Sequence, residues 1–278
     1  MKHRVYRLTL GSFLLFILIA QSPAHTAVAT NGHTDKVAVL MYHHLDNSNT
    51  NSLTITPALF RQQLTFLKSK GYHFISLHDF RLFMQGGPVP SNAVLITFDD
   101  GYESFYTQAY PILKELSVPA VNFVVTNYLL EVSPYLPHLS VDQIHAMRTE
   151  PPNIDFQCHT HDMHKKAGRK SYLTAHLVTA TGKESQQMYE NRVLQDTSTC
   201  LQLLNKVGMS ELNSFSYPYG IYNSQLSVLL LESGIRYAFT IHPGLASRGV
   251  DHLEIPRINA GSASISAKRL YQMINHLN

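Results

Sequence analysis

The sequence predicts an α/β fold, a single irregular (β/α) TIM-like barrel with seven or eight parallel strands. Short apolar segments alternate with amphipathic ones from residue 37 to the end of the chain, and such alternation favours a parallel sheet covered by helices. The chain has 278 residues, 44% hydrophobic and 15% charged, which suits one large, well-packed domain. Polar residues directly follow several apolar segments, and barrels of this type carry reactive groups at the carboxyl ends of strands.

Eight apolar segments predict the strands, which span residues 37–41, 73–75, 93–97, 120–125, 154–157, 214–216, 237–240 and 254–258. Helices are predicted at 57–70, 77–84, 141–147, 184–207 and 266–277, with another ending near residue 115. The first helix has the clearest bounds, because Thr56 suits the N-cap, Pro57 suits the first helical position and Gly71 suits the end.

The first 29 residues have the three-part pattern of a secretory signal peptide. A basic segment precedes an apolar run over residues 8–20, and a small-x-small cleavage site follows at 27–29. The run is shorter than the ~20 residues that span a bilayer. We expect residues 1–29 to be the signal peptide of an exported protein without a stable membrane span, and residues 30–278 to be the catalytic domain. A retained leader that anchors the protein is the alternative.

Charge argues against a nucleic-acid partner. The chain has 22 Lys and Arg against 19 Asp and Glu, and three of the basic residues lie in the leader, which has no acidic residue. The remainder is therefore neutral, whereas a nucleic-acid binder normally has a basic face. We expect a monomer without a nucleic-acid partner.

Two cysteines, Cys158 and Cys200, are too few for a disulfide framework. An oxidising compartment allows one bridge, but the sequence does not show that the two residues are close. We expect two free thiols.

Two adjacent carboxylates stand where the third predicted strand ends, in Thr97-Phe98-Asp99-Asp100-Gly101. Adjacent carboxylates at a strand end can point in different directions, so one can bind a metal while the other accepts a proton. Asp-Asp-Gly also occurs in ordinary turns. Taken alone, the run supports a catalytic site and a plain turn equally.

Three histidines lie within six residues after the fifth predicted strand, in His159-Thr-His161-Asp-Met-His164. Neutral imidazole is the commonest ligand of zinc-like ions. Two histidines with one aspartate leave positions open for water, which is typical of a catalytic metal site. The spacing alone does not select two ligands among the three histidines.

A sharp turn follows the strand at 214–216, in Phe215-Ser-Tyr-Pro218-Tyr219-Gly220. Pro218 and Gly220 constrain the turn, so Tyr219 can present its backbone N–H and its ring to a ligand. A loop with buried tyrosines is the alternative interpretation of this run.

Together these three runs resemble the polysaccharide deacetylases, the NodB-homology group also called carbohydrate esterase family 4. Thr97–Gly101 matches the first motif of that family letter for letter, and the resemblance extends from about Val37 to the end of the chain. The run Val39–His44 and the spacing from His159 to His164 are similar to a subgroup with permuted motif order. That subgroup comprises exported deacetylases of poly-N-acetylglucosamine and related surface glycans.

The resemblance implies a catalytic role for each matching residue. Asp99 is the expected general base. Asp100, His159 and His164 are the expected ligands of a divalent metal ion, for which we expect zinc. Tyr219 is expected to help form the oxyanion hole through its backbone N–H.

The general acid and the residue that orients the base are less directly matched. His43 occupies the position of an active-site histidine in the subgroup and is the expected acid, with His242 as the alternative. Many family members have an arginine in the third motif, where this chain has Ser216. Arg257 is the expected substitute that orients Asp99.

The implied reaction is metal-dependent hydrolysis of N-acetyl groups on N-acetylglucosamine units of a cell-surface or extracellular polysaccharide. Peptidoglycan, chitin oligomers and O-acetylated xylan remain alternative substrates. A non-catalytic glycan-binding protein is a further alternative, although such a protein would not need a base at Asp99.

Overall fold

The structure is a computed structural model that describes residues 1, 32–48, 51–180 and 182–278. Apart from Met1, the predicted leader over residues 1–29 lies outside the described residues. None of the helices in the described ranges is long and apolar enough to cross a membrane.

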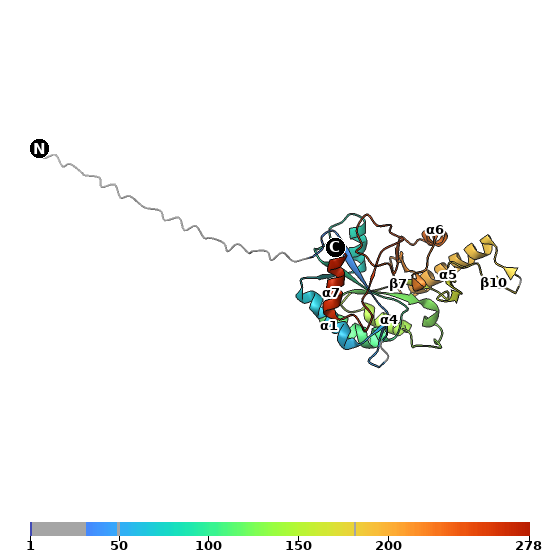
Figure 1. Cartoon of the computed structure of the whole chain (residues 1–278), viewed down its shortest axis with the longest axis horizontal. Helices are drawn as coiled ribbons and strands as arrows, with labels where there is room; N and C mark the ends of the chain where they lie inside the picture. The colour runs from blue at the N-terminus through green and yellow to red at the C-terminus, as the bar shows by residue number, and fades with distance from the viewer. Residues whose placement is uncertain (2–31, 49–50, 181) are drawn as a thin grey trace. The chain divides into compact units, whose positions relative to one another are not determined.

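A curled parallel sheet of eight strands organises the fold (Figure 1). Its strands are β1 (Val37–Tyr42), β4 (His73–Ile75), β5 (Ala93–Phe98), β6 (Ala120–Val125), β7 (Ile154–Thr160), β12 (Ser214–Ser216), β13 (Tyr237–Phe239) and β14 (Ile258–Asn259). They follow the order β13-β12-β7-β6-β5-β1-β14, while β4 pairs with the first half of β5, and all these pairs are parallel. The predicted parallel α/β architecture is confirmed. Among the described residues, β13 and β14 stand at the two ends of this strand order and do not pair with each other, so a closed barrel is not observed.

Seven α-helices accompany the sheet in the described residues: α1 (Pro57–Ser69), α2 (Leu77–Met84), α3 (Tyr110–Leu116), α4 (Val141–Arg148), α5 (Gln186–Lys206), α6 (Ser224–Glu232) and α7 (Ala267–His276). Shorter elements are a π-helical turn at Phe105–Ala109, 3-10 turns at Thr126–Leu129 and Pro218–Gly220, and the two-residue strands β2 (His44–Leu45), β3 (Thr54–Ile55), β8 (Lys166–Ala167), β9 (Lys170–Ser171), β10 (Val178–Thr179) and β11 (Gly182–Lys183). Helices α1 and α7 lie side by side (Figure 1).

Side chains alternate between two apolar layers along the central strands. In β5, Val94 and Ile96 join the layer between sheet and outer helices, whereas Ala93 and Leu95 face the inner layer that α2 covers. This alternation follows from the two-residue period of a strand. Both faces of the sheet are therefore buried, and its reactive side chains gather where the strands end.

The predicted element bounds hold closely where a local signal marks them. The Thr56 side chain accepts a hydrogen bond from the Leu59 N–H at the start of α1, as expected for the N-cap. The strand predicted at 254–258 is shorter than expected. Only Ile258 and Asn259 form β14, and Pro256 lacks the N–H that a longer ladder needs.

Helix α6 and the small hairpins β8–β9 and β10–β11 are absent from the sequence prediction. Asn223 caps α6 through a hydrogen bond from the Leu226 N–H. That asparagine is the local signal that could have indicated the helix.

The expectation of two free thiols is wrong. Cys158 in β7 and Cys200 in α5 form a disulfide, with their Cα atoms 6.0 Å apart. Helix α5 packs against β7 and brings the two residues together across a sequence separation of 42. The sequence does not reveal this packing.

Candidate metal centre and active site

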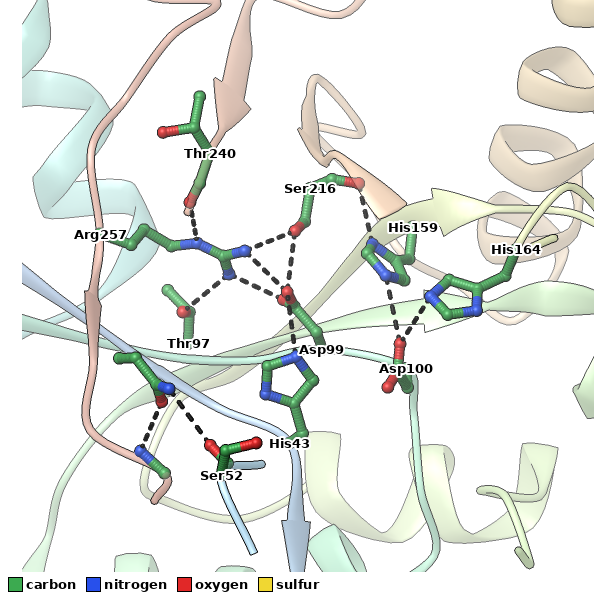
Figure 2. Close-up of polar contacts among 12 residues, drawn as sticks. His43, Ser52, Thr97, Asp99, Asp100, His159, His164, Ser216, Thr240 and Arg257 are labelled. Carbon is green, nitrogen blue, oxygen red and sulfur yellow. Dashed lines mark hydrogen bonds and ion pairs between the residues drawn. The ribbon is translucent and has the colours of Figure 1, made fainter. Parts of the chain in front are cut away.

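The predicted site residues lie at one edge of the sheet. His43 follows β1, Asp99 and Asp100 follow β5, and His159 is near the end of β7. Because every strand pair in the main sheet is parallel, the carboxyl ends of these strands meet at the same edge. Figure 2 shows the side chains pointing toward one another from these separate strands.

Asp99 is held by a buried arginine. Arg257 Nη1 lies 2.8 Å from Asp99 Oδ1, and Nη2 lies 2.7 Å from Oδ2 (Figure 2). The guanidinium also donates to the Thr240 carbonyl and to the Thr97 and Ser216 hydroxyls. Arg257 is fully buried. This two-pronged pairing fixes the plane of the carboxylate.

Asp99 remains a carboxylate despite its burial. Removal from water opposes ionisation, but the charge and hydrogen bonds of Arg257 outweigh it, so the pKa of Asp99 is below its usual value. The Ser216 hydroxyl donates to Oδ2 at 3.0 Å. Asp99 is therefore ready to accept a proton at neutral pH.

Asp100 faces the two histidines. Its Oδ1 atom lies 3.2 Å from Nε2 of His159 and 3.2 Å from Nε2 of His164. The backbone of Asp100 has φ 74°, a conformation that turns the chain sharply after the strand. One ligand atom from each of the three residues fits within a 4.8 Å cluster.

The histidine geometry fits a metal ion. His159 Nδ1 lies 2.8 Å from the Ser216 carbonyl oxygen, to which it donates, so Nε2 is the ring nitrogen left to bind a metal. Burial lowers the pKa of His164 to about 4, with Asp100 opposing that shift. Its imidazole is therefore neutral at neutral pH, which is the form that binds metals. An Asp-His-His donor set suits a zinc-like ion with positions left open.

A β-bulge places His159. Val124 pairs with Cys158 and Val125 pairs with Thr160, so His159 is the extra residue in β7. A bulge changes the direction of a side chain and is common next to active sites. Here it lets the ring of His159 face Asp100.

The structure brings His43 to the site and leaves two other histidines outside it. His43 Nε2 lies 4.0 Å from Asp99 Oδ2, and burial lowers the pKa of His43. His161 turns to Thr126, with Nδ1 3.1 Å from the hydroxyl. His242 is exposed, and its ring packs near Tyr222. Neither His161 nor His242 lines the cleft that contains Asp99 and Asp100.

Tyr219 covers one side of the Asp100, His159 and His164 cluster. Its backbone is left-handed at φ 60°, its ring centroid lies 4.5 Å from that of His164, and its hydroxyl donates to the His164 carbonyl. Lys166 Nζ lies 4.3 Å from the centroid of the same ring. The turn 218–220 therefore braces His164 and borders the site.

Comparison with known proteins identifies the family. The sequence profile described as "Polysaccharide deacetylase" matches residues 86–238, more than half of the chain. The chain belongs to the polysaccharide deacetylase family. The matched range contains Asp99, Asp100, His159, His164 and Tyr219. It excludes His43 and Arg257, which reach the site of this deacetylase-family chain from either side of that range.

Individual relatives agree with this family. A poly-beta-1,6-N-acetyl-D-glucosamine N-deacetylase of Staphylococcus epidermidis is 29% identical over 208 residues, which cover 74% of this chain and 67% of the relative. The protein of the same description from Staphylococcus aureus is 26% identical, covering 84% and 78%. The Streptococcus pyogenes deacetylase PplD, solved in complex with acetate, is 25% identical with a TM-score of 0.71, covering 87% and 99%.

The site of this family member opens into two adjoining cavities. A cleft of about 530 Å³ is lined by both aspartates, His43, His159 and His164. A neighbouring cavity of about 720 Å³ is bordered by the tyrosine-rich segment 127–138. Both cavities share the residues Asp100, Tyr102, His164, Lys166 and Tyr219. The site therefore lies in an extended depression rather than a closed pocket.

Two residues of the site were missed by sequence reasoning. Ser216 contacts Asp99 and Arg257 through its hydroxyl and His159 through its carbonyl, yet the sequence marks it only as a departure from the family motif. Lys166 borders both cavities from the short strand β8. No sequence pattern points to Lys166, because the hairpin that carries it is itself unpredicted.

Proposed function

We propose that this chain is a metal-dependent hydrolase that removes N-acetyl groups from N-acetylglucosamine units of an extracellular or cell-surface polysaccharide. One observation carries the proposal. A carboxylate held by arginine, Asp99, stands directly beside an Asp-His-His set. The names of the staphylococcal relatives support the substrate.

Asp100, His159 and His164 would hold the metal ion, and zinc is the ion we propose. When bound, such an ion lowers the pKa of water and polarises a carbonyl oxygen. The tautomer of His159 and the neutral state of His164 support this assignment. The ring of Tyr219 shields His164 from one side.

Asp99 serves as the general base in this proposal. It accepts a proton from the water that attacks the acetyl carbon, and Arg257 keeps the carboxylate oriented toward that water. The backbone N–H of Tyr219 donates to the oxyanion that forms on the acetyl oxygen. The bond between the carbonyl carbon and nitrogen then breaks, releasing acetate and a free amine.

His43 serves as the acid that protonates the departing amine. Burial lowers the pKa of His43, so the imidazole is neutral at rest and must gain a proton before it can donate one. Asp99, whose carboxylate lies 4.0 Å from His43 Nε2, gains a proton when it acts as base. This proximity supports a proton path from Asp99 through His43 to the amine.

The two adjoining cavities support a polymer as the substrate. A sugar unit in the cleft at His43 and Asp99 would have neighbours along the tyrosine-bordered cavity. Aromatic faces cover the apolar faces of sugar rings. The signal-peptide pattern over residues 1–29 supports export, with residues 30–278 as the catalytic domain.

Acetate release from a substrate panel tests this function. The panel comprises poly-β-1,6-N-acetylglucosamine, chitin oligomers, peptidoglycan and acetylxylan, each assayed with added zinc, cobalt, nickel or manganese and with chelator. We expect the first substrate to react fastest and chelation to abolish release. A faster reaction with acetylxylan would show that the enzyme is an esterase acting on O-acetyl groups, rather than an amidase acting on N-acetyl groups. No release from any substrate by metal-loaded protein would overturn the proposal.

A further inference from the structure

Helix α5 holds the segment that carries both proposed histidine ligands. We call residues 159–164 the metal loop. The Asp196 carboxylate on α5 accepts three hydrogen bonds from this loop: from the Thr160 hydroxyl at 2.5 Å, the His161 N–H at 2.9 Å and the Asp162 N–H at 2.8 Å. Asp196 is 6% exposed. All three donors lie between His159 and His164.

Thr160 has an unusual backbone conformation. Its φ is 149°, a region that L residues rarely occupy and that is unfavourable for a β-branched residue. Residues persist in such conformations only when their surroundings hold them. The Thr160 hydroxyl donates to Asp196 and accepts from the Met163 N–H at 3.0 Å. This pair of bonds holds the loop at the bulge that directs His159.

The disulfide tethers the other side of His159 to the same helix. Cys158 immediately precedes His159, and its partner Cys200 lies four residues after Asp196. Residues four apart occupy the same face of a helix. One face of α5 therefore fixes the chain on both sides of His159.

Asp196 lies outside the reacting groups. It lines neither cavity at the site, and none of the ion pairs among the described residues involves it. The three donors of the metal loop supply the partners that a buried carboxylate requires. The carboxylate thus acts on the loop and not on a substrate.

We propose that Asp196 is a positioning residue of the metal centre, which sets the separation and direction of His159 and His164 by holding the loop between them. This inference rests on the metal-ligand roles in the proposed function. An asparagine at position 196 would keep one acceptor oxygen and turn an NH₂ group toward a loop donor. Two hydrogen-bond donors would then face each other. The loop would move away from the conformation that directs His159 and His164 toward Asp100.

Metal affinity of the apoprotein is the decisive measurement. Zinc is titrated against a chromophoric chelator, and cobalt is added separately to record its visible spectrum. We expect Asp196→Asn to bind zinc roughly 10–100-fold more weakly, as is typical when the support of a metal ligand is removed. We also expect an altered cobalt spectrum, which a loss of stability alone would not produce.

Thr197→Val is the matched control. Thr197 is fully buried on the same helix, and its hydroxyl donates to the Val193 carbonyl within α5. This variant should keep the zinc affinity and cobalt spectrum of the unaltered protein. A fall in its affinity equal to that of Asp196→Asn would overturn the inference.

Two variants at Thr160 test the same link if Asp196→Asn does not fold. Thr160→Val removes the hydroxyl and should weaken zinc binding, whereas Thr160→Ser retains it and should bind nearly as the unaltered protein does. Zinc affinity unchanged in Asp196→Asn, or in Thr160→Val where the first variant does not fold, would contradict the proposal. Because metal binding is measured without substrate, absence of deacetylation on every glycan would overturn the proposed function alone.

Discussion

Asp99 and Asp100 are neighbours in the chain, yet their carboxylates have different partners. Asp99 is bound by the Arg257 guanidinium at 2.7 and 2.8 Å, while Asp100 Oδ1 lies 3.2 Å from the Nε2 atoms of both His159 and His164. The left-handed backbone at Asp100 lets the second carboxylate turn toward the histidines. Two residues can therefore perform two separate tasks at one strand end.

Asparagine substitutions separate these two tasks. Asp99→Asn removes the proposed proton acceptor, so we expect acetate release to fall roughly 10²–10⁴-fold, the usual contribution of general acid–base catalysis, with zinc still bound. Asp100→Asn removes a proposed anionic ligand, so we expect weaker zinc affinity and partial recovery of activity in excess zinc. Both quantities are measured side by side, with thermal unfolding to account for stability.

The pattern of losses decides the assignment. Loss of zinc in Asp99→Asn alone would reverse the two roles. If both variants lose acetate release and zinc affinity equally, and these losses are explained by lower unfolding temperatures, Asp99 and Asp100 are only turn residues.

His161 and His164 provide a second comparison within three residues. His164→Ala removes a proposed ligand that faces Asp100, so we expect zinc binding and acetate release to be nearly abolished. His161→Ala removes a ring that contacts Thr126, so we expect most of the zinc affinity and activity to remain. Metal content is measured by elemental analysis after dialysis. A zinc-free His161→Ala beside a zinc-loaded His164→Ala would show that the wrong pair was chosen.

The sequence predicts that Asp100, His159 and His164 lie close together, for a simple reason. Each follows or ends a buried segment, and parallel strands place their carboxyl ends at one edge. His43 is expected at the site from the family resemblance, and it directly follows the first strand in the structure. The spacing alone does not choose between His161 and His164. The family resemblance favours His164, and in the structure the ring of His164 turns to Asp100 while that of His161 turns to Thr126.

Other features depend on packing that the sequence does not display. The bridge between Cys158 and Cys200 needs α5 to lie against β7, across a separation of 42 residues. The same packing brings Asp196 to the metal loop. Helix α6 has a local signal at its N-cap, Asn223. The helix has only nine residues and lies between two strands whose apolar segments are the stronger signal in this part of the sequence. Barrel closure likewise depends on how the strands curl, which apolar segments alone do not specify.

Arg257→Lys tests how the environment of Asp99 sets the pH dependence. Lysine keeps the positive charge but loses the two-pronged geometry, and a charge-assisted hydrogen bond contributes about 1.5–3 kcal/mol. We therefore expect kcat/KM to fall roughly 10–100-fold. Because Arg257 lowers the pKa of Asp99, the variant should have a higher Asp99 pKa. A base acts when deprotonated, so the acid limb of the kcat/KM profile should move to higher pH.

Arg81→Lys is the control for this substitution. Arg81 is also buried, but it donates to Glu211 and Ser214, away from the residues of the site. Its replacement should lower the unfolding temperature and leave the pH profile in place. An acid limb that stays unchanged in Arg257→Lys, or moves to lower pH, would contradict the assignment of Asp99 as the base.

The disulfide between Cys158 and Cys200 should contribute measurably to stability. A bridge that closes a loop of this length restricts the unfolded chain, and typical contributions are about 2–4 kcal/mol. We expect the reductant-treated protein and the double variant Cys158→Ala/Cys200→Ala to unfold at a lower denaturant concentration than the oxidised protein. Their free energy of unfolding should be lower by about the same 2–4 kcal/mol. Treatment with reductant should destabilise the unaltered protein but not the double variant, because only the former has a bridge to lose. Thiol titration of the unfolded, unreduced protein gives the independent check. Two titratable thiols in protein purified from an oxidising compartment would contradict the bridge and restore the original expectation of free cysteines.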